Sequence, residues 1–236
     1  GILEKSNYYM CKQTSDNKIL KIGWLSSGMG EGSLRLFESV MKSIKSGYIN
    51  TRIDYVFCNR GLKESEKTDS FLQIVRNYNI PLITFSSKKF KGNVLSYNRQ
   101  IWDKMRVFKT DFLIAAGYKQ IILEFFKTTA ILNLHPALPN GPTGTWKTVI
   151  AELIEKNAKH SGLMINRVTK DVDRGPVLTY CKFPIPKLEF SAIRYEQLKR
   201  EGIFMVETIK AITDKKIILS NTEALDISDL VDKKTR

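Results

Sequence analysis

The chain has 236 residues, of which 42% are hydrophobic and 26% are charged, and its formal net charge is +14. These fractions are close to globular averages, so they exclude long disorder, collagen-like repeats and coiled coils. No apolar run reaches the roughly 18 residues that a membrane span needs, and residues 1–17 contain no apolar segment of signal-peptide type. We therefore expect no membrane partner and a cytoplasmic location.

The cysteines exclude two kinds of structural cross-link, and the charge limits the kinds of binding partner. Cys11, Cys58 and Cys181 are too few and too widely spaced for a disulfide framework or a zinc site, so we expect reduced thiols, with Cys58 and Cys181 packed in strands. The positive charge favours an anionic partner, such as a phosphorylated metabolite, a carboxylate-bearing ligand or RNA, or else forms an ordinary solvated surface. Because the sequence has no RNP-type aromatic segment, no GxxG loop in a helical pair and no zinc knuckle, we expect no nucleic-acid partner.

Strands and helices alternate along the first 135 residues. The first strand, 19–25 (ILKIGWL), is apolar enough for burial on both faces, and it leads through a glycine-rich turn at 26–33 to a helix that ends near Gly47. The alternation continues with strands at 53–58, 82–85, 112–116 and 130–134, and with helices around 71–75 (capped near Thr68) and 96–104. This pattern predicts an α/β fold: an open, mostly parallel twisted sheet with helices on both faces, of Rossmann-like type.

The order of helices and strands changes after residue 140. We predict a helix at 145–156, strands at 162–168 and 177–183 that are separated by the turn-rich segment 171–176, and a long helix at 193–213. We interpret 1–18 and 216–236 as tails, of which the first 17 residues and the last dozen are poorly tethered. A single domain over 19–215 remains.

The glycine-rich turn is the first candidate site, because ligands of open parallel sheets gather at the carboxyl ends of the strands. Glycines allow backbone N–H groups to approach a phosphate, and the following helix adds a favourable dipole. The GxGxG spacing matches neither the dinucleotide fingerprint nor the GxxxxGK[ST] loop, so either a cradle for a smaller phosphorylated ligand or a tight turn fits the pattern. The residues of the cradle would be Gly28, Met29, Gly30, Glu31, Gly32 and Ser33.

The second candidate site combines two loops. Asn133 and His135 lie two residues apart at the end of a strand, so their side chains point the same way. Asp171 and Asp173 precede a glycine-proline turn that could bring an acid to the imidazole. Each signal alone has a structural explanation, as a hydrogen-bonding histidine or as turn-capping acids. Together they indicate a catalytic site.

These motifs resemble the folate-dependent formyltransferase superfamily, and most closely its glycinamide ribonucleotide branch, over residues 19–215. The specific matches are NLHP at 133–136 and DVDRGPV at 171–177, and they are joined by the glycine turn, VFCNR at 56–60 and AAGY at 115–118. The resemblance implies a catalytic trio of Asn133, His135 and Asp173, with the glycine turn holding the phosphate of the substrate. It implies folate contacts at Gly117, Tyr118, Lys119, Gln120, Ile121, Thr169, Lys170 and Asp171.

The implied reaction is formyl transfer from 10-formyltetrahydrofolate to a primary amine of a phosphorylated small molecule such as glycinamide ribonucleotide, as in purine biosynthesis. Asn133 and a protonated His135 would stabilise the developing oxyanion. Asp173 would favour the charged imidazole and accept the excess proton of the amine, directly or through a water. The reaction needs no metal, and we expect a monomer or a homodimer.

Other members of the superfamily remain alternatives. The loop HPALP, the stretch NGPTGTW and Asn166, where the family often has histidine, depart from the usual pattern and leave the acceptor open. An amino-sugar nucleotide N-formyltransferase fits, as does a non-catalytic folate- or RNA-binding module of the same fold. Methionyl-tRNA formyltransferases and formyl-folate hydrolases usually have a further domain, for which we expect this chain to be too short.

Overall fold

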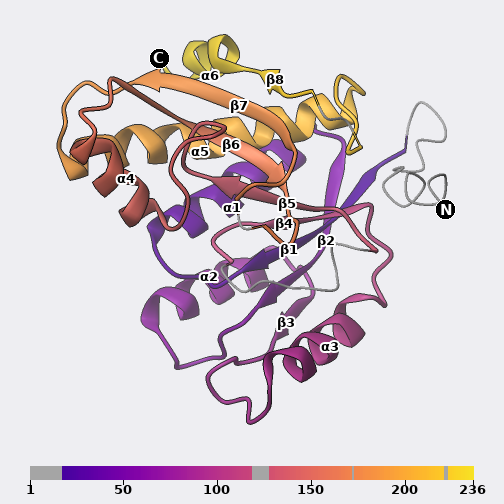
Figure 1. Cartoon of the computed structure of the whole chain (residues 1–236). Coiled ribbons are helices and arrows are strands. Elements are labelled where there is room, and N and C mark those ends of the chain that lie inside the picture. The colour runs from indigo at the N-terminus through magenta and orange to yellow at the C-terminus, as the bar shows by residue number, and fades with distance from the viewer. Residues whose placement is uncertain (1–17, 119–127, 172, 221–222) are drawn as a thin grey trace, which may run out of the picture. The chain divides into compact units, whose positions relative to one another are not determined.

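The computed structural model describes residues 18–118, 128–171, 173–220 and 223–236 (Figure 1). The described chain forms two compact units. The N-terminal unit contains residues up to 38 and residues 50–132, and the C-terminal unit contains residues 39–49 and 133–236. The predicted N-terminal tail, 1–17, lies outside the described residues, and the predicted domain limits of 19 and 215 stay predictions.

The N-terminal unit has a parallel sheet in the order β3-β2-β1-β4, followed by the start of β5. Consecutive residues of β1 and β4 are buried, as expected for strands that are covered on both faces. The bounds of the strands are Leu20–Ser26 (β1), Thr51–Cys58 (β2), Leu82–Thr84 (β3), Phe112–Ala115 (β4) and Ile131–His135 (β5). The helices α2 (Glu66–Asn77) and α3 (Val94–Met105) belong to this unit, as does the first part of α1 (Glu31–Lys45), whose residues from 39 onward are counted in the C-terminal unit.

Aromatic side chains fix α1 and α2 in this unit. Phe37 of α1 makes edge-to-face contacts with Trp24 of β1 and Phe71 of α2, each with ring centroids 5.7 Å apart. The predicted cap of α2 at Thr68 is wrong, because the helix begins at Glu66, after Ser65. Thr68 is instead a buried first-turn residue whose hydroxyl donates to the carbonyl oxygen of Ser27 at 3.2 Å.

The C-terminal unit continues the strand order from the end of β5 through β6 (His160–Arg167) and β7 (Val177–Pro184) to β8 (Leu225–Asp226). β6 and β7 are antiparallel, as the turn predicted between them requires, and β7 and β8 are parallel. The helices are α4 (Trp146–Glu155), α5 (Phe190–Thr213) and α6 (Ser228–Thr235). The predicted α/β class with an open, mostly parallel sheet is therefore confirmed.

The prediction of a poorly tethered C-terminus is wrong. β8 pairs with β7, and α6 lies beside it in Figure 1 with Val231 fully buried. The ammonium group of Lys234 lies 2.7 Å from a carboxylate oxygen of the buried Glu207 and 2.8 Å from the hydroxyl of Tyr48. A two-residue strand and an eight-residue helix are too short to show a hydrophobic period, which is why the sequence pattern missed them.

Among the described residues, no helix combines the length and the apolar character that crossing a membrane would require.

The two buried cysteines generate a first prediction. Burial raises the pKa of the Cys58 thiol to about 11 and that of the Cys181 thiol to about 12, so near neutral pH both groups are protonated and shielded. In a Cys11→Ser variant, a thiol reagent should therefore find no rapidly reacting cysteine in the native protein and two after unfolding in concentrated urea. Rapid labelling of either thiol in the native state would show that its strand is not packed as described.

Candidate functional site

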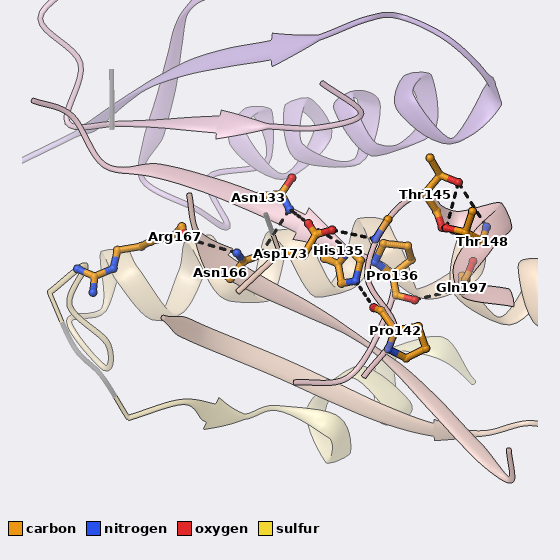
Figure 2. Close-up of polar contacts among 11 residues, drawn as sticks. Asn133, His135, Pro136, Pro142, Thr145, Thr148, Asn166, Arg167, Asp173 and Gln197 are labelled. Atoms are coloured by element: carbon orange, nitrogen blue, oxygen red, sulfur yellow. Dashed lines mark hydrogen bonds and ion pairs between the residues drawn. The ribbon is translucent and has the colours of Figure 1, made fainter. Parts of the chain in front are cut away.

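The end of β5 brings the predicted catalytic trio together. Asn133 and His135 occupy alternate positions of this strand, so both side chains lie on the same side of it. Figure 2 shows both next to Asp173. Oδ1 of Asp173 lies 3.3 Å from Nδ2 of Asn133 and 3.5 Å from Nδ1 of His135. Two nitrogens from one strand therefore converge on a single carboxylate oxygen.

His135 is held in one ring orientation. Its side chain is 2% exposed, and its Nε2 lies 2.7 Å from the carbonyl oxygen of Pro142. A carbonyl oxygen only accepts hydrogen bonds, so Nε2 carries a hydrogen and donates it. Nδ1 is left facing Asp173 (Figure 2). The loop that follows β5 thus determines which nitrogen of the ring faces the acid.

Groups on two sides contact the carboxylate of Asp173. Its Oδ2 accepts a hydrogen bond of 3.1 Å from the backbone N–H of Gly144, while Oδ1 faces Asn133 and His135. Its φ of +55° places it in the left-handed region, which costs an L-residue about 1–2 kcal/mol and which aspartate tolerates better than most. The turn between β6 and β7 therefore holds Asp173 in a backbone conformation that is less favourable than the usual ones.

Gly175 allows the turn that presents Asp173. A Cβ at this position would lie 1.7 Å from the carbonyl oxygen of Arg167, which is a backbone atom that cannot swing aside. The N–H of Arg167 in turn donates to the carbonyl of Pro176 at 2.9 Å. Only glycine permits this approach of the turn to the end of β6.

Sequence reasoning missed three groups that complete the site. Asn166 of β6 is buried, and its Oδ1 lies 3.4 Å from Nδ2 of Asn133. The sequence shows it only as a departure from the family pattern, although its place next to the last residue of β6 is a usable signal. The carbonyl of Pro142 and the N–H of Gly144 are backbone groups, whose direction no residue type reveals.

The predicted phosphate cradle is partly helix. α1 begins at Glu31, so Glu31, Gly32 and Ser33 form its first turn instead of a loop. The loop is therefore shorter than the run of glycines suggests. The N–H groups of a first helical turn have no partner within the helix, which suits them to anions. Gly28 and Gly30 have φ of +61° and +94°, as a tight strand-to-helix turn requires. The sulfur of Met29 lies 3.5 Å from the hydroxyl oxygen of Thr68.

The residues implied for folate lie in two segments. After β4, the carbonyl of Gly117 accepts from the N–H of Ser27 at 3.3 Å, and Tyr118 is buried with its ring against Phe57. Lys119, Gln120 and Ile121 lie outside the described residues. After β6, the hydroxyl of Thr169 bonds both the N–H and the carbonyl of Asp171 at 3.3 Å, while the side chains of Lys170 and Asp171 are exposed.

Within the described part of the chain, no three histidine, cysteine, aspartate or glutamate side chains are grouped so that they could hold a metal ion.

Comparison with known proteins identifies the family. The family model described as "Formyl transferase" matches residues 28–216, which is most of the chain. The chain belongs to the formyl transferase family. Curated family members include the phosphoribosylglycinamide formyltransferase of Dictyostelium discoideum, which is 27% identical over 198 residues that cover 75% of this chain and 92% of the relative. The enzyme of the same name from Escherichia coli is 24% identical over 165 residues, covering 68% of this chain and 71% of the relative.

Solved structures of family members share the fold. The phosphoribosylglycinamide formyltransferase of Coxiella burnetii superposes with a TM-score of 0.73 at 18% identity and covers 87% of this chain and 92% of its own. The glycinamide ribonucleotide transformylase 1 of Symbiobacterium toebii gives a TM-score of 0.72 at 19% identity, with 84% and 89% of the two chains covered.

A second prediction follows from Gly175. Replacing it by alanine should lower the free energy of unfolding by about 3 kcal/mol, because the added methyl group collides with backbone that cannot yield. Urea unfolding measures this loss. Gly61→Ala is the matched control, since its Cβ would meet only the flexible side chain of Glu64 at 3.3 Å. Equal stabilities of the two variants would contradict the close approach described.

Proposed function

We propose that this chain transfers a formyl group from 10-formyltetrahydrofolate to the primary amine of a phosphorylated small molecule, with glycinamide ribonucleotide as the first candidate. The observation that best supports this proposal is the convergence of Nδ2 of Asn133 and Nδ1 of His135 on one carboxylate oxygen. Donors that surround a single anionic oxygen are what the tetrahedral intermediate of an acyl transfer needs. Relatives named phosphoribosylglycinamide formyltransferase favour the acceptor and a role in purine biosynthesis.

In the proposed reaction Asn133 and His135 stabilise the oxyanion, and Asp173 accepts a proton. The amine nitrogen attacks the formyl carbon, and the former carbonyl oxygen gains negative charge where Asn133 and a protonated His135 can donate to it. Oδ1 of Asp173 marks this position, and its carboxylate moves aside to take the excess proton of the amine, directly or through a water. The bond from the formyl carbon to the carrier nitrogen then breaks, and the carrier nitrogen receives a proton.

The remaining implied contacts belong to the same proposal. The backbone of Gly28, Met29 and Gly30 and the first turn of α1 at Glu31, Gly32 and Ser33 would receive the phosphate of the acceptor, supported by the helix dipole. The donor would lie along Gly117 to Ile121 and Thr169 to Asp171. The chemistry is complete without a metal ion, and it works in a monomer or a homodimer.

The proposal is tested with purified protein, 10-formyltetrahydrofolate and a panel of amines that includes glycinamide ribonucleotide and amino-sugar nucleotides. Release of free folate should require one amine of the panel. Substitution His135→Ala, or Asn133→Leu, should lower kcat about 100- to 1,000-fold, because each removes one donor to the oxyanion.

The exposed His160, at the start of β6, provides the matched control, because His160→Ala removes the same side chain where it contacts no member of the trio. Release of folate without any amine would identify a hydrolase. Full activity of His135→Ala would contradict the assigned mechanism, and failure of the donor to bind would contradict formyl transfer itself.

A further inference from the structure

The loop that follows β5 orients two members of the trio through its backbone. We name residues 136–146 the His-Pro loop. Its Pro142 carbonyl fixes the ring of His135 at 2.7 Å, and its Gly144 N–H fixes Oδ2 of Asp173 at 3.1 Å. Any group that holds this loop in place therefore also sets the distance between the imidazole and the carboxylate.

Side chains of α5 hold both ends of the His-Pro loop. At the first end, Nε2 of Gln197 donates to the carbonyl oxygen of Pro136, the residue after His135, at 3.3 Å (Figure 2). At the other end, the guanidinium carbon of Arg194 lies 4.2 Å from the ring centroid of Trp146, within cation–π range. Trp146 is the first residue of α4, so this contact anchors the point where the loop becomes helix.

Arg194 connects the two ends. Its NH1 donates to Oε1 of Gln197 at 3.0 Å and to Oε1 of Glu201 at 3.2 Å. Because the guanidinium can only donate, it selects the amide oxygen of the fully buried Gln197 and turns the amide nitrogen toward Pro136. Burial raises the pKa of Glu201, and the charge of Arg194 opposes that rise. The ion pair with the buried carboxylate of Glu201 thus restrains the Arg194 side chain at its contact with the loop.

We infer that Arg194 is a positioning residue for the transfer reaction, holding the His-Pro loop at Trp146 directly and at Pro136 through Gln197. The inference rests on the proposed function, because it assigns Arg194 an effect on His135 and Asp173. Each described contact of Arg194 is with another side chain of the C-terminal unit, so its effect reaches the reacting atoms only through the loop.

The test compares Arg194→Met with Arg200→Met. Arg200 is on the same helix, lies over the Phe183 ring at 4.5 Å and pairs with Glu196, so the control removes a similar stacked and ion-paired arginine whose contacts lie elsewhere. Arg194→Met should lower kcat about 10- to 100-fold, the cost of displacing catalytic groups by about 1 Å. Its KM for 10-formyltetrahydrofolate should change less than about twofold, since uniform binding is untouched. Arg194→Lys should recover only part of kcat, because lysine lacks the planar fork.

A cycle with Asp173→Asn separates positioning from general damage. If Arg194 acts through the orientation of the trio, Arg194→Met should cost much less in the Asp173→Asn background than in the wild type, because the two changes act on one unit. Residual turnover is followed by mass spectrometry of the formylated amine. Should Arg194→Met fail to fold, Arg194→Met with Glu201→Gln removes both charges of the ion pair and keeps the same comparison.

The outcomes separate the two proposals. A wild-type enzyme that is active, with His135→Ala inactive and Arg194→Met equal to Arg200→Met in kcat, overturns the positioning role and leaves the proposed function standing. An equal loss from Arg194→Met in both backgrounds also overturns it. A wild-type chain without transferase activity overturns the proposed function, and with it the positioning role that rests on it.

Discussion

The site depends on one constraint, the alternation of side chains along β5. Because residues two apart in a strand lie on the same side, Asn133 and His135 present their nitrogens in parallel, and the turn after β6 needs to supply only one carboxylate to meet both. The catalytic proposal requires little more than this: two donors whose positions relative to each other are set by the strand, and an acid whose position is set by a turn. The strand is the rigid partner, and the turn is the adjustable one.

Most of the supporting contacts come from backbone. The carbonyl of Pro142 contacts the ring of His135, and the N–H of Gly144 contacts the carboxylate of Asp173. The close approach of Gly175 to the carbonyl of Arg167 shapes the turn between β6 and β7. Backbone groups cannot be altered without moving the chain, so the precision of such a site depends on how firmly the loop is anchored. In this molecule the anchor is a buried polar network on α5 that also stacks on Trp146. The network gives the buried Gln197 and Glu201 of α5 their polar partners.

Much of this could be predicted from the sequence, for identifiable reasons. Apolar runs of strand length alternate with segments of helical period, so the sequence predicts the sheet and its parallel strands. The motifs NLHP and DVDRGP contain Asn133, His135 and Asp173, so the trio could be predicted from the residues themselves. The predicted start of α1 is wrong because glycine is compatible with both a turn and a first helical turn. The cap predicted near Thr68 is wrong because α2 begins directly after Ser65. Arg194 could not be assigned, because its role arises from packing between elements distant in the sequence. Asn166 is visible in the sequence only as a departure from the family pattern near the end of a strand, and its contact with Asn133 depends on the packing of β6 beside β5.

The central claim is that Asn133 and His135 share one oxyanion position, which Oδ1 of Asp173 occupies in this structure. The most direct measurement is a crystal structure of the protein with a folate analogue that carries an aldehyde in place of the formamide and hydrates to a tetrahedral diol. The account predicts one diol oxygen within about 3 Å of both Nδ2 of Asn133 and a ring nitrogen of His135, with the carboxylate of Asp173 displaced toward the second oxygen. A diol bound with Asp173 still between the two nitrogens, or with its oxygen on one donor alone, would contradict it.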